Sequence, residues 1–321
     1  MSQNEISVAL VGAGDFGINY LNHLLASAQV KLVGVADKNE EVRTRVSNQN
    51  QIPVFESLEK LLQKQRPMAL ILCTPPTAHI DDLMLAVDHK LPTLVEKPVV
   101  ANRAGLDYLH SLSPYSRQLI TPAHLTRHLE SVRLLRQRLK DQKIKLINAW
   151  RYVPKERLKI HGHDHPALSA MIHDLDLVQS VQPLDLETMH VDYSRSKTDL
   201  PHPDSVVVTF KTKSDAIVVV GNSWSLPNSN RYVEASFDVI TESEKLSLKT
   251  PSDSLAISGK EGDEFPAPEL GLSPSLYGGG AFGRQLAAFL SSVAQDTHRE
   301  VSLDDAIETL ELAIQISEKS K

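Results

Sequence analysis

The sequence predicts an α/β protein in which a doubly wound parallel sheet is followed by a second α/β region with a mostly antiparallel sheet. Three observations support this prediction. From Ile6 to about Thr121, short apolar runs alternate with segments of helical periodicity. After residue 122 this alternation ends. From Leu186 to Leu248, strand patterns follow one another through short turns of Pro, Asn, Ser and Asp.

The first region alternates strand and helix patterns in a regular order. Its strand patterns are ISVALVG, VKLVGVAD, ALILCTPP, PTLVEKP and RQLIT, and the helical patterns between them are INYLNHLLAS, EEVRTRVSNQ, IDDLMLAVDH and ANRAGLDYLHSL. Continuous apolar strands are typical of a parallel sheet that helices cover on both faces. We therefore assign residues 1–122 to one domain and residues 123–321 to a second.

The second region begins with a basic helical segment, RHLESVRLLRQRLKDQ, and a strand candidate, KLINAWRYV. The strand patterns that follow are ETMHVDYSRS, DSVVVTFKT, AIVVVGNSW, EASFDVIT and EKLSLK. Connections this short join antiparallel neighbours, because parallel neighbours need a longer crossover. The chain then returns to helix in GRQLAAFLSSVAQ and SLDDAIETLELAIQISEKS, where Ser302 is in the N-cap position.

Composition excludes several classes of partner. The chain has 34 Lys and Arg against 40 Asp and Glu, with both signs interspersed, so no basic surface for nucleic acid or an anionic membrane is expected. No secretory signal pattern opens the sequence and no run of 18 apolar residues occurs, which predicts a cytoplasmic protein with a small-molecule partner. The single cysteine, Cys73, lies in an apolar run and is predicted to be a buried structural thiol.

A glycine-rich turn follows the first predicted strand. VALVGAGDFG places Gly12, Gly14 and Gly17 in GxGxxG spacing before a predicted helix. Such glycines allow a tight turn, close approach of the backbone to a pyrophosphate and close packing of helix on strand. We predict a dinucleotide site that includes the neighbouring Asp15 and Phe16. The alternative is a turn in an α/β domain that binds no nucleotide.

Asp37 ends the second predicted strand, 25 residues after Gly12. An acid at this position accepts hydrogen bonds from the adenosine ribose and repels a 2′-phosphate, which favours NAD over NADP. Lys38 partly offsets this repulsion, so NADP is kept as a possible cofactor. The alternative is that Asp37 only begins the polar turn DKNEE.

The run LVEKPV ends a predicted strand in Glu96, Lys97 and Pro98. Proline has no N–H for the ladder and restricts the residue before it, so the strand stops with Lys97 at its carboxyl end. Ligands of open α/β sheets bind outside these ends. Lys97 is therefore predicted to hydrogen-bond a substrate oxygen and to stabilise alkoxide character as hydride leaves. The alternative is a solvated surface lysine.

LSAMIHDLDLVQ, residues 168–179, predicts a helix with one apolar stripe. The stripe consists of Leu168, Met171, Ile172, Leu175 and Val178. Ser169, His173 and Asp176 share the neighbouring face, at spacings of four and three. His173 is therefore a candidate for proton exchange at neutral pH, although a single helical histidine is more often structural.

Taken together, these motifs resemble the glucose-fructose oxidoreductase / inositol dehydrogenase / MocA (Gfo/Idh/MocA) family of nicotinamide-dependent oxidoreductases. The resemblance covers nearly the whole chain, through VGAGDFG, VADKNEE, CTPPTAH, VEKPVV, LTRHLESV, IHDLDL, GNSWSLP and FGRQLAAFLSSV. It implies a Rossmann domain followed by an α/β domain with a large, mostly antiparallel open sheet that binds substrate and forms a subunit interface. It also implies hydride transfer between NAD(P) and a secondary alcohol or ketone of a sugar, polyol or sugar derivative, by a homodimer or homotetramer.

The resemblance implies roles for individual residues. Glu96 and Lys97 would lie by the nicotinamide, Lys97 would polarise the reacting oxygen, and His173 would exchange the proton. The matched motifs add Thr74, Pro75 and His79 as cofactor-binding residues, and Arg127, Ser169 and Trp224 as substrate-binding residues beside Lys97 and His173. The alternative for Trp224 is burial at the subunit interface. The peptide bond before Pro98 is a candidate cis bond.

Two departures from the family pattern leave alternatives open. Ser169 stands where many members carry an Asp, and GHDHPAL replaces a glycine-rich approach to the helix. We favour His173 acting alone with Lys97 over a contribution from Asp164 or His165. Two other functions are weighed: a regulator that senses NAD or a sugar without catalysis, and redox-neutral glycoside cleavage that uses NAD.

Two further patterns are interpreted as structural. KIHGHDHPA holds His161, His163 and His165, but no fourth ligand follows at a recognisable spacing, so no metal is predicted. YGGGAFG, residues 277–283, follows no apolar strand and is interpreted as a lead-in to a helix.

Overall fold

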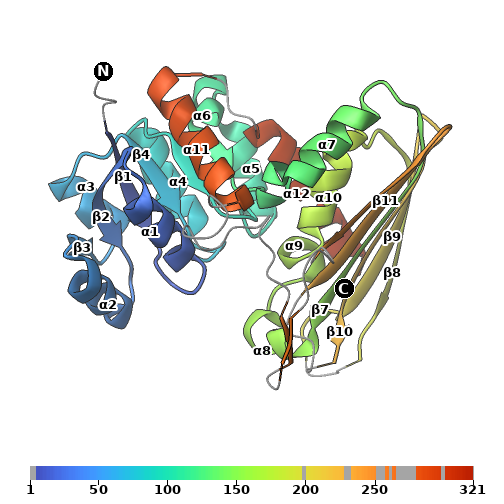
Figure 1. Ribbon diagram of the computed structural model, residues 1–321, viewed down its shortest axis with the longest axis horizontal. Coiled ribbons are helices and arrows are strands. Elements are labelled where there is room, and N and C mark those ends of the chain that lie inside the picture. Colours follow the sequence, from blue (N-terminus) through green and yellow to red (C-terminus); the bar gives the residue numbers. More distant parts are fainter. Residues whose placement is uncertain are drawn as a thin grey trace. The chain divides into compact units, whose positions relative to one another are not determined.

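The computed structural model describes residues 5–196, 200–227, 233–250, 257–259, 262–264, 280–297 and 301–320. The chain divides into two compact units, drawn together in Figure 1. The first consists of Met1–His128 and Pro268–Ile307, and the second of Leu129–Ala267 and Glu308–Lys321. Among the described residues, none of the helices combines the length and the apolar character that crossing a membrane requires.

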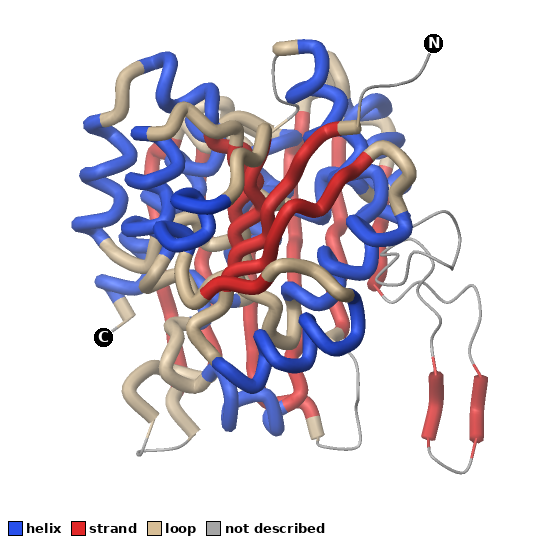
Figure 2. The backbone as a smooth tube through the Cα atoms, turned by 90° about the vertical axis from the view of Figure 1, so that its left-hand side faces the viewer, coloured by secondary structure: helices blue, strands red, loops and turns tan. Residues whose placement is uncertain are grey.

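The first unit is built on six parallel strands in the order β3-β2-β1-β4-β5-β6, which run side by side in Figure 2. The strands are β1 (Ile6–Val11), β2 (Val30–Ala36), β3 (Val54–Phe55), β4 (Ala69–Leu72), β5 (Thr93–Val95) and β6 (Ile120–Pro122). The order reverses between β1 and β4, so right-handed crossovers place the helices on both faces of the sheet. The predicted doubly wound sheet is confirmed.

Helices connect these strands, and their bounds follow the capping residues of the sequence. They are α1 (Gly17–Ala26), α2 (Glu40–Asn50), α3 (Leu58–Lys64), α4 (His79–Asp88), α5 (Arg103–Ser111), α6 (Pro114–Leu119) and the 3₁₀ turn η1 (Leu125–His128). The side chains of Asn39, Ser57, Asn102 and Ser113 accept hydrogen bonds from first-turn backbone N–H groups.

A late helix completes the core of the first unit. Helix α11 (Gly280–Gln295) contributes Phe282, Leu286 and Phe289 to the cluster formed by β1 and α1. The predicted domains, 1–122 and 123–321, follow the chain without such a return. A linear reading of periodicity cannot show which sheet a late helix packs on, because its apolar stripe is equally suited to either.

The second unit holds a six-stranded sheet in the order β12-β11-β7-β10-β9-β8. Its strands are β7 (Ile144–Pro154), β8 (Leu186–Ser194), β9 (Ser205–Thr212), β10 (Ile217–Leu226), β11 (Glu234–Thr241) and β12 (Lys245–Thr250). Every pair is antiparallel except β7 with β10. The predicted mostly antiparallel sheet is confirmed. A short hairpin is formed by β13 (Ile257–Gly259) and β14 (Gly262–Glu264).

Helices lie over one face of this sheet (Figure 1). They include α7 (Glu130–Leu139), α9 (Pro166–Ser169) and α10 (Ile172–Val181), while η2 (Lys155–Arg157) and α8 (Leu158–His161) follow β7 and α12 (Leu303–Lys319) ends the described chain. Ile147 and Ala149 are fully buried toward the helices. The alternate residues Trp150 and Tyr152 point to the opposite face, where their rings stack with centroids 5.8 Å apart.

Candidate active site

The turn after β1 has the geometry of a phosphate-binding loop. Gly12 has φ of +87°, and a Cβ there would lie 2.6 Å from the carbonyl carbon of Cys73, so only glycine fits. A Cβ at Gly17 would lie 2.1 Å from the carbonyl oxygen of Gly12, which requires glycine where α1 approaches the turn. Around a Cβ at Gly14 no atom lies within 4 Å, so the loop is open on this side. The open side meets the amino end of α1, where backbone N–H groups favour an anion.

Asp37 is anchored between this loop and the end of β2. Its Oδ2 accepts a hydrogen bond from the Ala13 N–H at 2.9 Å, and its Oδ1 accepts one from the Asn39 N–H at 2.9 Å. The carboxylate is thus oriented by backbone, and each oxygen retains a lone pair for a ribose hydroxyl. Asp15 and Phe16 lie in the exposed part of the loop, and Phe16 is 42% exposed.

Two arginines of α2 that the sequence reasoning missed support this corner. Arg45 Nη2 donates to the Ala13 carbonyl oxygen at 2.7 Å. Arg43 Nη1 donates to the carbonyl oxygens of Asp37 and Lys38 at 2.8 and 2.9 Å. Their signal in the sequence is weak, because arginine at alternate positions of a polar helix usually faces water.

The loop after β4 is held in place by polar contacts with His79, the first residue of α4. This side chain is fully buried. Its Nε2 lies 2.6 Å from the Thr74 carbonyl oxygen, and its Nδ1 lies 3.1 Å from the carbonyl oxygens of Pro98 and Val99. Burial lowers the pKa of the ring, and the three carbonyl groups oppose that shift. His79 therefore links the turn Thr74–Pro75–Pro76 (the TPP turn) to the segment Glu96–Lys97–Pro98 (the EKP segment).

Thr74 has a second partner on α4. Its hydroxyl donates to Asp82 Oδ2 at 3.0 Å. Burial raises the pKa of Asp82 to about 6, and the Thr74 hydrogen bond opposes the rise. Pro75 follows Thr74 at the start of the same turn, whose Ala78 N–H donates to the Pro75 carbonyl oxygen.

Glu96 and Lys97 follow β5, as predicted. Glu96 is partly buried, its Oε1 accepts a hydrogen bond from the Tyr20 hydroxyl at 2.9 Å, and its Oε2 accepts one from the Lys97 N–H at 3.1 Å. Desolvation raises the pKa of Glu96 to about 7, while the Lys97 charge and these hydrogen bonds oppose the rise. The bond between Lys97 and Pro98 is cis. Cys73, predicted to be buried, is partly buried.

In the second unit the prediction of one helix over residues 168–179 is wrong. Helix α9 ends at Ser169, and α10 begins at Ile172. The Met171 N–H donates to the Pro166 carbonyl oxygen at 2.9 Å, and the Ser169 hydroxyl donates back to the His165 carbonyl oxygen at 3.2 Å. These local bonds compete with the regular ladder and interrupt the helix. Of the predicted stripe, Met171, Ile172, Leu175 and Val178 are buried, and Leu168 is partly buried.

Helix α10, which carries His173, is fixed to the sheet by an ion pair. Arg151 of β7 donates to both oxygens of Asp174, from Nε at 2.8 Å and from Nη2 at 3.0 Å. Asp174 is 2% exposed and Asp176 is fully buried. Because Asp174 is adjacent to His173, the pair sets the rotation of α10 that presents the histidine. Sequence reasoning missed this partner, since 23 residues separate the two side chains.

His165, one of the alternative acid/base groups, is occupied by structural contacts. Its Nδ1 accepts a hydrogen bond from the Ala167 N–H at 3.1 Å, which caps α9, and its Nε2 lies 3.0 Å from the Ser320 hydroxyl oxygen. Asp164 is exposed. Within the described ranges, no three His, Cys, Asp or Glu side chains are grouped as a metal site would require.

The remaining site residues lie in both units. Trp224, at the end of β10, is buried against Val153 and Ala170 in the second unit. Arg127 belongs to the first unit, and its Nη1 donates to Asp305 Oδ2 at 2.9 Å. Lys97 and Arg127 thus belong to one unit, and Ser169, His173 and Trp224 to the other. The meeting of Lys97 with His173 stays a prediction.

Part of one predicted segment lies outside the described residues. Of YGGGAFG, residues 277–279 are outside, and residues 280–283 form the first turn of α11.

Comparison with known proteins identifies the first unit. Residues 6–114 match the model of an oxidoreductase family, Gfo/Idh/MocA, with an NAD-binding Rossmann fold. This stretch therefore has the NAD-binding Rossmann fold of that family. The match contains the glycine loop, Asp37, the TPP turn and the EKP segment.

The likeness to known proteins also covers the second unit. UDP-N-acetylglucosamine 3-dehydrogenase of Acidithiobacillus ferrooxidans is 26% identical over 203 residues, which are 61% of this chain and 61% of that protein. A myo-inositol dehydrogenase from Corynebacterium glutamicum matches with a TM-score of 0.81 and 18% identity, over 99% of this chain and 98% of that one. GenD2 from gentamicin A biosynthesis, in complex with NAD, matches with a TM-score of 0.83 and 15% identity, over 99% and 94% of the two chains. At this identity the structures show a shared fold.

Proposed function

We propose that the protein transfers hydride between NAD and a secondary alcohol or ketone of a sugar, polyol or sugar derivative. The observation that carries this proposal is the position of Lys97 and Glu96 at the carboxyl end of β5. Because β1, β4 and β5 are adjacent and parallel, the glycine loop, the TPP turn and the EKP segment lie along one edge of one sheet. Nucleotide-binding and reactive groups therefore share that edge.

The loop geometry supports a dinucleotide as cofactor. The open side of Gly14 accommodates a pyrophosphate, and the oriented Asp37 carboxylate accepts ribose hydroxyls. The negative charge of Asp37 repels a 2′-phosphate, so NAD is preferred. Lys38 partly offsets this repulsion, so NADP binds more weakly. When bound, the nicotinamide supplies the acceptor of the hydride.

The chain's own residues handle the oxygen and the proton. In the oxidative direction, the Lys97 ammonium donates a hydrogen bond to the substrate hydroxyl oxygen, which stabilises the negative charge that develops there. His173 accepts the hydroxyl proton as general base, and the carbinol hydrogen leaves with its electron pair as hydride. Ser169 carries no carboxylate and donates to a backbone carbonyl, so His173 performs this step alone.

The substrate class rests on the relatives, whose names specify a UDP-sugar and inositol. The face of the second sheet that carries Trp150 and Tyr152 is proposed as the contact between copies in a homodimer or homotetramer. Its exposed apolar residues include Ile217 and Ile240, at 45% and 37% exposure.

The test follows NADH formation across aldoses, inositols, amino sugars, sugar acids and UDP-sugars. Lys97→Ala is expected to lower kcat by roughly a hundredfold or more while NAD affinity is retained, because it removes a transition-state contact. Lys60→Ala, at an exposed lysine of α3, is the matched control. Unchanged turnover in Lys97→Ala would contradict the role of Lys97. Binding of NADH without turnover of any compound would favour the regulator or the redox-neutral glycoside reaction.

A further inference from the structure

A row of three polar side chains crosses the interior of the first unit. Tyr20 comes from α1, Gln285 from α11, and Glu96 from the end of β5. The Tyr20 hydroxyl oxygen lies 2.9 Å from Glu96 Oε1 and 2.9 Å from Gln285 Oε1. Tyr20 is 1% exposed and Gln285 is 2% exposed, so bulk water does not compete for these contacts.

Counting protons shows that this row has two hydrogen-bonded forms. The Tyr20 hydroxyl has one proton but faces two oxygens, and Gln285 Nε2 has no hydrogen-bond partner among the described residues. If Glu96 is ionised, a half-turn of the amide lets Gln285 Nε2 donate to the Tyr20 oxygen, and Tyr20 donates to Glu96. If Glu96 is protonated, it donates to Tyr20, and Tyr20 donates to Gln285 Oε1. The half-turn leaves the shape of the amide unchanged.

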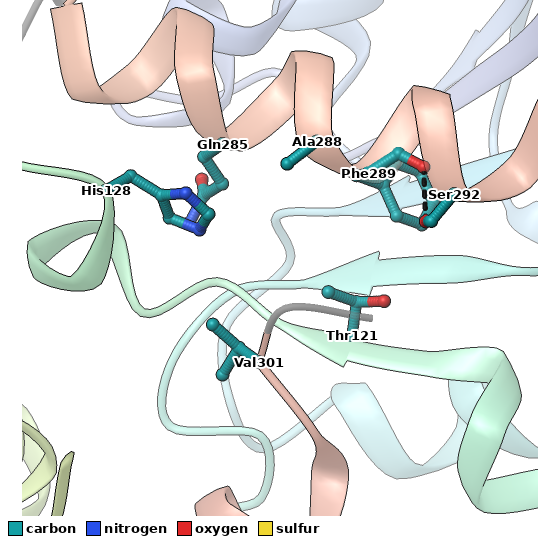
Figure 3. A pocket seen from close by; sticks show the side chains of 7 residues that line it. All are labelled: Thr121, His128, Gln285, Ala288, Phe289, Ser292 and Val301. Atoms are coloured by element: carbon teal, nitrogen blue, oxygen red, sulfur yellow. Dashed lines mark hydrogen bonds between the residues drawn. The ribbon is translucent and has the colours of Figure 1, made fainter. Parts of the chain in front are cut away.

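A small cavity beside Gln285 completes both forms. It has a volume of about 10 Å³, and Gln285 extends into it from α11 in Figure 3. The Thr121 hydroxyl, on the opposite wall, also has no hydrogen-bond partner in the described part of the chain. A cavity of roughly this size with two polar groups is large enough for one water molecule. Such a water would bond whichever amide atom faces away from Tyr20.

We propose that Tyr20 and Gln285 are positioning residues that set the protonation of Glu96 beside Lys97, and thereby the preference of the site for oxidised or reduced cofactor. This proposal rests on the proposed function and on the position of Glu96 by the nicotinamide that the family resemblance implies. An ionised Glu96 attracts the positively charged oxidised ring, and a protonated Glu96 does not. Reversal of the donor order along Gln285, Tyr20 and Glu96 lets one buried framework hold both charge states.

Three groups interact with the Glu96 carboxyl directly: the Tyr20 hydroxyl, the Cys73 thiol and the Lys97 ammonium. The Gln285 amide acts on it through Tyr20. Desolvation raises the pKa of Tyr20 and of Cys73 well above their ordinary values, so both remain neutral near pH 7. The pKa of Glu96, raised to about 7, places its change of charge in the physiological range. Glu96 therefore changes charge in this range while Tyr20 and Cys73 stay neutral.

The first experiment measures the affinities for NAD⁺ and NADH between pH 5.5 and 8.5. The ratio of the dissociation constant of NADH to that of NAD⁺ is expected to rise with pH, by about tenfold, around the pKa of Glu96. Tyr20→Phe keeps the ring but removes the donor to the ionised form, so the midpoint should move up by about one pH unit. Gln285→Glu should move it in the same direction, because a second carboxyl competes for one hydroxyl proton. Tyr115→Phe, an exposed tyrosine of the same unit, should leave it unchanged.

A second readout does not depend on the cofactor. Infrared spectroscopy follows the carboxyl band of the free protein as pH changes, and subtracting the spectra of Glu96→Gln leaves the signal of Glu96. The Asp82→Asn background removes the other carboxyl whose pKa is raised. Tyr20→Phe should shift the Glu96 transition upward while the circular dichroism spectrum is retained. An unshifted transition in both Tyr20→Phe and Gln285→Glu would overturn the proposal. Absence of NAD⁺ and NADH binding would instead overturn the proposed function, and the infrared titration would still decide the role of Tyr20 and Gln285.

Discussion

Glu96 makes the stability of the free protein depend on pH. Its pKa is raised from 4.5 to about 7 in the folded state, so between these values the folded chain holds a proton that the unfolded chain has lost. The contribution of Glu96 to stability is therefore greatest below pH 4.5 and falls as pH rises toward 7. At about 1.4 kcal/mol per pH unit this amounts to at most about 3 kcal/mol, because partial exposure screens the group.

Glu96→Gln tests this dependence. The free energy of unfolding of the variant, minus that of the wild type, is expected to increase by up to about 3 kcal/mol as pH rises from 4.5 to 7.5, and to stay constant above. Urea unfolding at a series of pH values measures it. Glu59→Gln, at an exposed position of α3, should show no such trend. Parallel pH curves for Glu96→Gln and the wild type would contradict the raised pKa.

Substitutions at Gly12 and Gly14 are expected to affect different properties: the first stability, the second NAD affinity. Gly12→Ala places a Cβ 2.6 Å from backbone at a positive φ, so the variant should lose about 2 kcal/mol or more of stability. Gly14→Ala meets open space and should keep its melting temperature, but its methyl group would stand where a pyrophosphate approaches. Its NAD affinity should fall at least tenfold. Thermal unfolding and NADH fluorescence titration distinguish the two, and full NAD affinity in Gly14→Ala would remove the loop from the cofactor site.

At the scale of elements, the ion pair between β7 and α10 determines how His173 is held. The Arg151 and Asp174 side chains are 14% and 3% exposed, so breaking the pair leaves a charge with little water. Asp174→Asn should cost about 3 kcal/mol in urea unfolding. The double variant Arg151→Met, Asp174→Leu should cost less than the single change, because it removes both charges. Glu130→Gln, which breaks the exposed pair with Arg133, should cost under about 1 kcal/mol. Equal losses of unfolding free energy in Asp174→Asn and Glu130→Gln would show that the buried pair contributes no more to stability than the exposed pair.

How far the sequence predicts each element depends on whether its cause is local. The parallel sheet, the turn at Gly12 and the end of β5 at Lys97 follow from periodicity, glycine and proline, all of which are readable within a few residues. The break between α9 and α10 depends on which hydrogen bonds Ser169 and Met171 form. A helical periodicity of about 3.6 residues does not predict these bonds.

Partners distant in sequence were not predictable. Tyr20 and Gln285 are 265 residues apart, and only the tertiary packing of α11 on α1 joins them. One signal was present: Gln285 interrupts an apolar helical stripe at a spacing of three from Phe282 and four from Phe289. A polar residue within such a stripe indicates a buried hydrogen-bond partner.

At the scale of the whole molecule, we expect an oligomer because of the sheet face of the second unit that presents Trp150 and Tyr152. Strand alternation directs Trp150 and Tyr152 away from the helices, and the Trp150 ring lies against Gly221 of β10, where an added Cβ would be 2.4 Å from it. A glycine that accommodates an indole on a sheet surface favours a flat aromatic face suited to pairing with a second copy.

Tyr152→Glu tests this assembly. Tyr152 is 36% exposed, so a carboxylate there should leave the fold intact while placing like charges across a symmetric contact. Sedimentation velocity is expected to show a species of at least two copies for the wild type and a 35.5 kDa monomer for the variant. Tyr115→Glu, at an exposed position of the first unit, should remain oligomeric. A wild type that sediments as a monomer at all concentrations would exclude this face as a subunit contact, and its stacked aromatic pair would then need a different partner.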